Sequence, residues 1–382
     1  MPHRFPWRAG NHFRLLVNGP QLFPAMFAAV EGARHSVRME MYLIASGRVA
    51  TRLIDRLVAA ARRGVSAQVL LDGFGALGLS AADRRRLIDG GVHLVFFNPP
   101  RLVRLEQNLF RSHRKLLLVD DEAAFVGGAG ITDEFDGEQG WRETVVEARG
   151  PVAGDWLAVF VEDWRHWADQ DRGMEIRHPP ALPDGLKGRV AINRGAGRGE
   201  IKRNLVVRMR RARDRVWLAT AYFIPSRKLR RALRRCARRG LDVRLVLPGP
   251  VADHPAVRYA SHRYYARLLR HGVRIFEYQD RFMHSKVGLV DDWVSIGSSN
   301  LDRWNLHWNL EANQEILSTR FADQVQHMLE TDMGNCLEIR YESWRERSCL
   351  QRCKEWFWGG LDLRLARWSA THRYRPPHKP GK

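Results

Sequence analysis

The octapeptide HRKLLLVD at residues 113–120 returns as HSKVGLVD at residues 284–291, and this repetition decides the fold. The histidine, the lysine and the aspartate of the two copies are all offset by the same 171 residues. One accidental match to the pattern H-x-K-x4-D is expected roughly 0.03 times in a chain of this composition. Two matches at a constant offset therefore indicate an internal duplication that carries chemistry.

The segments around the motifs repeat as well. The predicted strands are 37–44, 65–71 and 92–97 in the first half and 216–222, 241–247 and 273–278 in the second. A predicted helix separates each strand from the next, which is typical of an α/β fold with mainly parallel strands and helices on the sheet faces. We therefore expect two similar α/β units, related by a pseudo-twofold axis, that form one shared active site.

Four segments are expected along the chain. Residues 1–170 form the first unit, and the Pro- and Gly-rich residues 171–199 form a linker. Residues 200–335 form the second unit, and residues 336–382 form a basic, Trp-rich C-terminal segment.

The spacing of histidine and lysine within each motif indicates the chemistry. Residues i and i+2 of an extended strand project to the same face, so His113 points with Lys115 and His284 points with Lys286. Two such strands, brought together, surround a small volume that suits a phosphodiester. The lysines neutralise charge on the phosphate oxygens, as a metal ion would otherwise do. One imidazole attacks phosphorus, while the other protonates the leaving alkoxide.

Acidic residues accompany both motifs. Asp120 and Asp291 close the two repeats, and we predict them to be catalytic with the histidines and lysines. Glu143 and Glu311 stand 30 and 27 residues after the motif histidines. A carboxylate bound to the far nitrogen of a histidine fixes its tautomer and raises its basicity, and we predict this orienting role for both glutamates. The alternative is that they are unrelated surface residues.

A short polar run follows the second motif. Ser298 and Asn300 lie in the sequence GSSN and are predicted to donate hydrogen bonds to phosphate oxygens. The corresponding run after the first motif is GGAG, which ends at Gly130.

Together these residues resemble the phospholipase D superfamily. Three further runs, Val69–Gly73, Ala221–Pro225 and Asn309–Asn313, resemble the short bacterial cardiolipin synthase type without N-terminal membrane helices. Members of the family usually carry asparagine where Gly130 stands, so the first half has one phosphate ligand fewer.

The resemblance implies that a phosphatidyl group passes from phosphatidylglycerol to the hydroxyl of another phospholipid through a phosphohistidine. Glycerol is released, and no metal or other cofactor is required. The resemblance also implies that His113 is the nucleophile and His284 the acid and base, although the residues themselves leave this order open.

The charge of the chain bears on its partners. Sixty-three Lys and Arg residues against 42 Asp and Glu give a net charge of +21, which favours nucleic acid or an anionic membrane surface. Interleaved basic residues and tryptophans in the C-terminal segment suit the headgroup region of a membrane, although nucleic-acid bases stack on the same side chains.

Apolar runs of about 20 residues, which would span a bilayer, are absent from the sequence, as is a signal-peptide pattern. We therefore expect a peripheral protein on the cytoplasmic face of the membrane, with phosphatidylglycerol as substrate and nucleic acid as an unlikely partner. Phospholipid hydrolysis, cleavage of nucleic acid and a non-catalytic membrane-binding module stay open as alternatives.

Overall fold

The computed structural model describes residues 4–101, 108–168, 173–194, 199–302 and 308–348, together with Cys353 and Trp358. The first half contains β1 (Arg8–Val17), α1 (Asn18–Glu31), β2 (Ser36–Met41), α2 (Arg48–Arg62), β3 (Ser66–Asp72), α3 (Ala81–Asp89), β4 (His93–Phe97), β5 (Arg111–Ser112), β6 (Lys115–Val119), β7 (Ala123–Gly127), the 3-10 helix η2 (Asp133–Phe135), β8 (Thr144–Arg149) and α4 (Val152–Trp167). The second half contains β9 (Leu186–Arg194), α5 (Glu200–Arg211), β10 (Arg215–Ala219), α6 (Arg227–Arg238), β11 (Asp242–Pro248), α7 (Pro255–His262), α8 (Tyr265–Leu269), β12 (Arg274–Tyr278), β13 (Val287–Val290), β14 (Trp293–Gly297), β15 (Asn309–Leu317), α10 (Thr319–Gly334), β16 (Cys336–Ile339) and α11 (Tyr341–Arg345).

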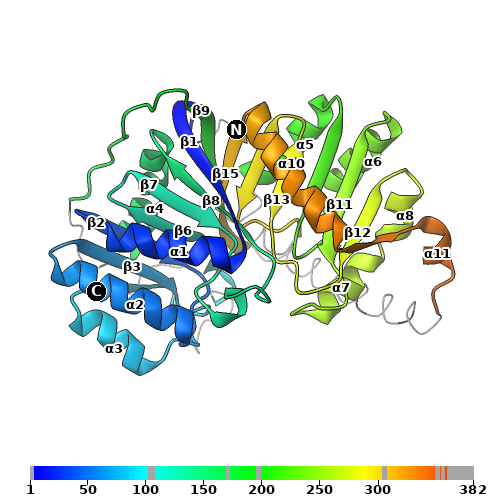
Figure 1. The fold of residues 1–382 in the computed structure, drawn as a ribbon. Helices are drawn as coiled ribbons and strands as arrows, with labels where there is room; N and C mark the ends of the chain where they lie inside the picture. Colours follow the sequence, from blue (N-terminus) through cyan, green and yellow to red (C-terminus); the bar gives the residue numbers. More distant parts are fainter. Residues whose placement is uncertain are drawn as a thin grey trace.

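The strands of the described residues form one continuous sheet whose order is the same in both directions from its centre (Figure 1). The antiparallel pair β1 and β9 lies in the middle. Outward from it the order is β8, β7, β6, β2, β3, β4 on one side and β15, β14, β13, β10, β11, β12 on the other. This symmetry is what a duplicated unit produces about a pseudo-twofold axis. The expected pair of similar α/β units is confirmed.

The sheet is mixed, and the expectation of mainly parallel strands was wrong in this respect. The strands joined through helices are parallel, as in β2–β3–β4 and β10–β11–β12. The motif strands β6 and β13 each run antiparallel to their neighbours on both sides. The turns that follow the motif strands are short, and a short turn can join only antiparallel neighbours.

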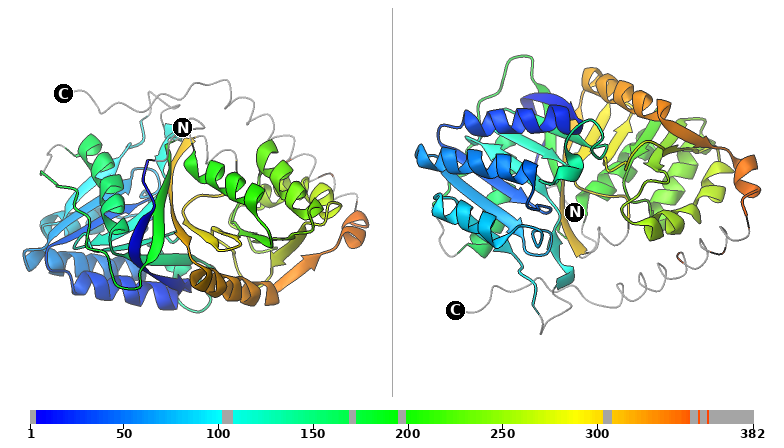
Figure 2. Two further views of the ribbon diagram at one scale, coloured as in Figure 1. Left: turned by 90° about the horizontal axis from the view of Figure 1, so that it is seen from above. Right: turned by 60° about the horizontal axis from the view of Figure 1, so that its bottom comes forward.

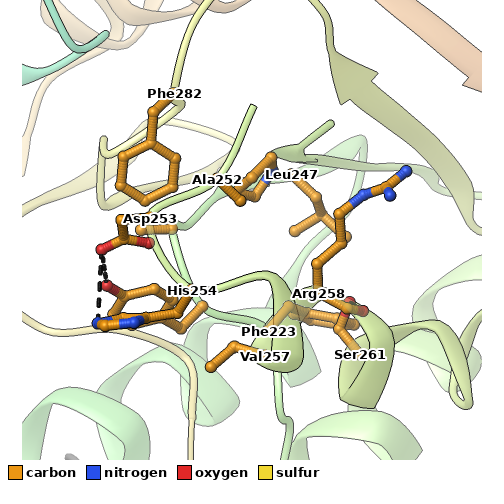
Figure 3. Close-up of a pocket in the computed structure, with 12 residues that line it drawn as sticks. Phe223, Leu247, Ala252, Asp253, His254, Val257, Arg258, Ser261 and Phe282 are labelled. Atoms are coloured by element: carbon orange, nitrogen blue, oxygen red, sulfur yellow. Dashed lines mark hydrogen bonds and ion pairs between the residues drawn. The ribbon is translucent and has the colours of Figure 1, made fainter. Parts of the chain in front are cut away.

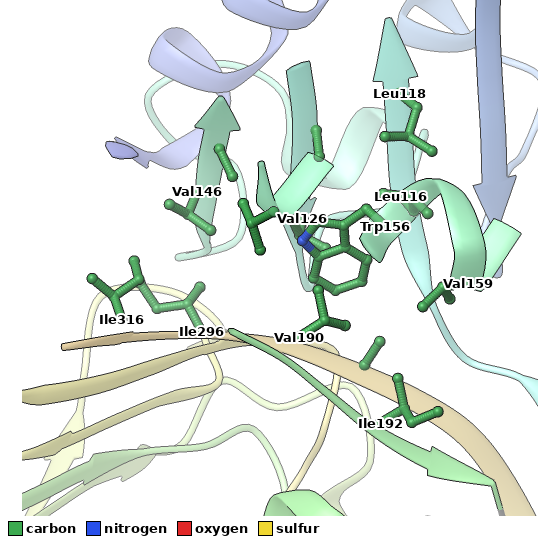
Figure 4. Packing of buried hydrophobic residues seen from close by; sticks show 14 of the residues in the cluster. Leu116, Leu118, Val126, Val146, Trp156, Val159, Val190, Ile192, Ile296 and Ile316 are labelled. Carbon is green, nitrogen blue, oxygen red and sulfur yellow. The ribbon is translucent and has the colours of Figure 1, made fainter. Parts of the chain in front are cut away.

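Helices cover both faces of the sheet in each half. In the first half α1, α2 and α3 lie on one face and α4 on the other, and in the second half α5 and α6 lie opposite α10 (Figure 2). The core beneath α4 is shared between the halves (Figure 4). Trp156 of α4 is fully buried there among Leu116 and Val126 of the first half and Val190 of the second. Its indole N–H donates to Oε1 of Gln314 across the interface, at 2.8 Å.

Part of the predicted linker is a strand. β9 pairs with both β1 and β15, so ladder structure of the second half begins before residue 200. Its apolar stretch, Val190–Ile192, is only three residues long and follows Gly188, which hides the strand in the sequence. A Cβ on Gly188 would lie 2.5 Å from the ring of Phe13, so the glycine permits the close packing of β9 on β1.

The predicted C-terminal segment likewise begins inside the second half. β16 pairs with β12, and Trp344 of α11 is buried against the rings of His262 and Tyr265. Most of this segment beyond residue 348 lies outside the described residues. Among the helices that the structure describes, none combines the length and the apolar character that crossing a bilayer requires.

Candidate active site

Each motif histidine is held by a backbone segment of the other half. β5 pairs with β15, and the N–H of His113 donates to the carbonyl of Leu310 at 2.9 Å. In the reverse direction the N–H of His284 donates to the carbonyl of Arg142, also at 2.9 Å. The two motifs therefore meet where the halves exchange backbone hydrogen bonds, and both histidines line one cavity.

The glutamates are paired crosswise with the histidines. Nδ1 of His284 lies 2.5 Å from a carboxylate oxygen of Glu143, and Nδ1 of His113 lies 3.1 Å from Glu311. Counting along the sequence places each glutamate after the histidine of its own half, but the structure joins it to the histidine of the other half. Since Nδ1 is occupied in both rings, Nε2 is the nitrogen left for chemistry.

Before a phosphate binds, burial and the neighbouring charges favour the neutral form of both imidazoles, which a nucleophile or a base requires. Burial, together with the nearby ammonium groups of Lys115 and Lys286, holds the pKa of His113 well below its ordinary value. The same causes lower the pKa of His284 to about 4. Burial also lowers the pKa of Lys115 to about 7. A bound phosphate anion would act against these shifts and favour the charged forms of the lysines and histidines.

The two glutamates differ in charge. Burial raises the pKa of Glu311 to about 8, and Lys115 offsets this only in part. Burial acts on Glu143 too, but Lys286 and His284 outweigh it and hold the pKa of Glu143 below its ordinary value. His284 therefore faces an ionised carboxylate, whereas His113 faces one that binds a proton more readily.

The polar run after β14 acts on one of these glutamates. The hydroxyl of Ser298 donates to Glu311 and is buried, so it holds the orienting carboxylate and does not line the cavity. Asn300 is fully buried, and its Nδ2 has no hydrogen-bond partner among the described residues. This free donor keeps Asn300 a candidate for a phosphate oxygen.

The first half has no room for the equivalent side chains. A Cβ on Gly128 would lie 2.4 Å from the carboxylate of Glu143, and one on Gly130 would lie 2.9 Å from the carbonyl of Leu43. The glycines thus let Glu143 and the backbone at Leu43 approach closely, and only the second half carries serine and asparagine at these places.

The structure does not bring Asp120 and Asp291 to the cavity. Asp120 accepts hydrogen bonds from the backbone N–H groups of residues 34, 35 and 36, and Asp291 accepts them from residues 213, 214 and 215. Asp120 follows Lys115 by five strand residues, which is about 16 Å. The prediction that these aspartates are catalytic was wrong. Both occupy left-handed turns, with φ of 52° and 51°, and fix the start of the neighbouring strand.

Aromatic residues that the sequence reasoning missed line the cavity, which has a volume of about 590 Å³. The ring of Tyr42 lies 4.6 Å from that of His113, and the ring of Trp141 lies 5.4 Å from that of His284. Tyr222 and Asp253 come from the second half. Tyr42 and Tyr222 each follow a strand that lies beside a motif strand, and Tyr222 also lies in the run Ala221–Pro225 that resembles the family. Among the described residues, no group of three His, Cys, Asp or Glu is placed to hold a metal ion.

The family model described as "Cardiolipin synthase, PLD-like domain" matches residues 26–164 and 205–333. The chain belongs to this family. One matched segment lies in each half of the sheet, so the resemblance seen in the motifs is confirmed.

Curated relatives cover most of the chain. Cardiolipin synthase B of Salmonella typhimurium is 37% identical over 347 residues, which are 87% of this chain and 83% of the relative. Cardiolipin synthase A of Pseudomonas putida is 37% identical over 373 residues, which are 95% of this chain and 75% of the relative.

Two solved structures share the fold. Phosphatidylserine synthase of Haemophilus influenzae matches with a TM-score of 0.74 at 14% identity, over 96% of each chain. Polyphosphate kinase of Porphyromonas gingivalis matches with a TM-score of 0.58 at 15% identity, over 93% of this chain and 53% of the kinase.

Replacing Asp120 with alanine should lower stability without removing a catalytic group. Three backbone N–H groups lose their acceptor, which costs about 1–3 kcal/mol. Burial opposes ionisation of Asp120, but the N–H groups outweigh it and lower its pKa. This stabilisation is therefore present above the unfolded-state pKa of about 4 and is lost as pH falls through the folded-state pKa. Urea unfolding of both proteins at pH 7 and pH 3 should show a smaller gap at pH 3; a variant that is fully stable yet inactive would contradict the structural role.

The rate should fall on the alkaline side as Lys115 loses its proton. Because the pKa of Lys115 is about 7, we expect an alkaline limb near pH 7 in kcat/KM, which reports the free enzyme. A bound phosphate keeps the ammonium charged, so the limb in kcat should lie at higher pH. In the control variant Lys115→Arg the charge persists and the limb should vanish, at a lower rate. An unchanged limb in that variant would show that another group titrates.

Proposed function

We propose that the protein is a phosphatidyltransferase of the cardiolipin synthase type. It transfers the phosphatidyl group of phosphatidylglycerol to the hydroxyl of a second phospholipid and releases glycerol. The observation that carries the proposal is the crossed pairing of two histidines with two buried glutamates around one cavity. The curated relatives support the substrate class, because they are cardiolipin synthases and their similarity extends over most of the chain.

The first step divides the work between the two histidines. Nε2 of His113 attacks phosphorus and forms the N–P bond, while the P–O bond to the glycerol headgroup breaks. His284, which takes up a proton as the phosphate anion binds, gives this proton to the leaving alkoxide. We assign the acid role to His284 because its partner Glu143 is ionised and acts against the burial that lowers the pKa of His284, whereas the partner of His113 binds a proton more readily. The phosphate anion, once bound, raises the pKa of His284 in the same direction.

The second step runs in reverse. The hydroxyl of the accepting phospholipid gives its proton to His284 and attacks phosphorus, so that a P–O bond forms and the N–P bond to His113 breaks. Lys115 and Lys286 stabilise the negative charge that builds on the phosphate oxygens in both steps. Side chains thus neutralise the charge on the phosphate oxygens, and we propose that no metal ion or other cofactor is required.

The proposal predicts a defined set of products. Protein incubated with phosphatidylglycerol vesicles should produce cardiolipin and free glycerol, read by lipid mass spectrometry, and EDTA should not change the rate. His113→Ala and His284→Ala should each lower turnover on the order of 10³-fold, since each histidine acts in both steps. A covalent phosphatidyl group should be trapped on His113.

Other products would change the assignment. Phosphatidic acid without cardiolipin would indicate a hydrolase. Cleavage of DNA without any lipid product would indicate a nuclease, the activity from another class that the net charge of +21 favours. Loss of activity with EDTA, restored by a divalent ion, would contradict charge neutralisation by lysine.

We also propose that the protein sits peripherally on the cytoplasmic face of the membrane, held in part by its C-terminus. Residues 359–382 carry six Lys or Arg and one acidic residue, and each basic residue near an anionic surface contributes about 1 kcal/mol. Trp344 is not part of this anchor, because it is buried in the second half.

Deletion of residues 359–382 should therefore weaken binding to phosphatidylglycerol vesicles in a sedimentation assay. It should leave turnover of a short-chain, detergent-solubilised substrate unchanged, because the deletion spares every described residue of the cavity. On zwitterionic vesicles the two proteins should bind alike. Equal binding of both proteins to the anionic vesicles would rule out this segment as an anchor.

A further inference from the structure

Asp253 places a carboxylate in the wall of the catalytic cavity. It lies in the loop between β11 and α7 and lines a small recess (Figure 3). It also lines the main cavity. Its side chain is only 18% exposed. No step of the proposed transfer uses this group, although it shares one cavity with His113 and His284.

The carboxylate is held in place by its neighbours. The hydroxyl of Tyr222 donates to Oδ2 of Asp253, and Nε2 of His254 lies 3.8 Å from the same oxygen (Figure 3). The second oxygen, Oδ1, has no hydrogen-bond partner among the residues that the structure describes. One acceptor is therefore fixed and available on this wall.

The first half has no equivalent. The corresponding loop, residues 73–80, reads GFGALGLS and contains no acidic side chain. Asp72, at the end of β3, accepts hydrogen bonds from the backbone N–H groups of residues 74, 75 and 112. The cavity is thus asymmetric: the loop after β11 carries a carboxylate, and the corresponding loop after β3 does not.

The position of Asp253 relative to His284 indicates what it binds. Phe282 lines the recess together with Asp253 (Figure 3). The ring of Phe282 lies 5.5 Å from that of His284. The carboxylate is therefore on the side of the proposed acid and base. In an in-line displacement the leaving and the entering oxygens both occupy the side opposite the nucleophile. That side holds the leaving glycerol in the first step and the accepting headgroup in the second.

The chemistry of a carboxylate narrows the ligand. The ligand of Asp253 is not the phosphate group, because a carboxylate repels an anion. Lys115 and Lys286 are the groups proposed to bind the phosphate. A carboxylate next to a phenol suits a neutral hydroxyl donor, and a charge-assisted hydrogen bond to it is strong.

We propose that Asp253, positioned by Tyr222, binds the hydroxyl groups of a glycerol headgroup and thereby selects a polyol acceptor over a simple alcohol or water. The inference rests on the proposed phosphatidyl transfer and assigns the acceptor subsite within it. Asp253 favours transfer over hydrolysis because a bound headgroup takes the place that water would occupy beside His284.

Competition between soluble acceptors tests the subsite. The full-length protein is given phosphatidylglycerol with equal concentrations of isotope-labelled glycerol and ethanol. Labelled phosphatidylglycerol, phosphatidylethanol and phosphatidic acid then report transfer to glycerol, to ethanol and to water. Asp253→Asn should lower the glycerol-to-ethanol product ratio about tenfold, the effect of losing a hydrogen bond to a charged group. Phosphatidylethanol formed in the same reaction is the reference, so a general loss of transfer rate cancels from the ratio.

Two further variants complete the test. Tyr222→Phe keeps the carboxylate but frees it to move, so the ratio should fall in the same direction by a smaller factor. Asp280→Asn removes an exposed acid of the same half that does not line the cavity, and its ratio should equal that of the unaltered protein. If Asp253→Asn forms no product at all, the ratio in Tyr222→Phe decides the question.

The outcomes separate the subsite from the proposed function. An unchanged ratio in both cavity variants, with ethanol transfer intact, overturns the subsite and leaves the transferase standing. A preference of the unaltered protein for ethanolamine over glycerol also overturns it, since the wall would then bind an ammonium group. Absence of every phosphatidyl product in the unaltered protein refutes the proposed function itself.

Discussion

The hydrogen bonds between each histidine and the glutamate of the opposite half are the constraint on which the site depends. Neither half alone contains a histidine with its orienting carboxylate, because Glu143 serves His284 and Glu311 serves His113. The interface must therefore be rigid. The shared core around Trp156 provides part of that rigidity. A buried ion pair between Arg142 and Asp332 provides more, and it fixes the backbone directly before Glu143.

Near-symmetry in the backbone coexists with asymmetry in the side chains. Ser298 donates to Glu311, whereas Gly128 at the equivalent place leaves Glu143 to Lys286 and His284. The two carboxylates consequently differ in pKa, and the two histidines differ in their readiness to hold a proton. A double displacement needs this difference, because one imidazole must stay neutral to attack while the other carries a proton.

The sequence was sufficient to predict the features that depend on the spacing of residues within a motif or between the two motifs. The alternation of His and Lys predicted three groups that line one cavity, His113, Lys115 and His284, and a fourth, Lys286, that lies beside His284. The constant offset predicted the duplicated unit. Long-range pairing was not accessible: nothing in the spacing of Glu143 shows that it contacts His284 and not His113. Asp120 was misassigned because the motif pattern does not distinguish an aspartate that reacts from one that fixes a turn. The sequence predicts a linker where β9 lies, because the stability of this strand comes from its two neighbouring strands and not from its own apolar content.

The central strand pair has a consequence for the history of the molecule. β1 and β9 are corresponding strands of the two halves and meet antiparallel, as identical strands do across the dyad of a homodimer. A chain of half this length would build the same two histidine–glutamate pairs by associating with a copy of itself. In such a dimer every substitution enters the site twice. Fusion of the two copies into one polypeptide removes that restriction, so that a residue such as Asp253 changes one wall of the cavity and leaves the other as it was.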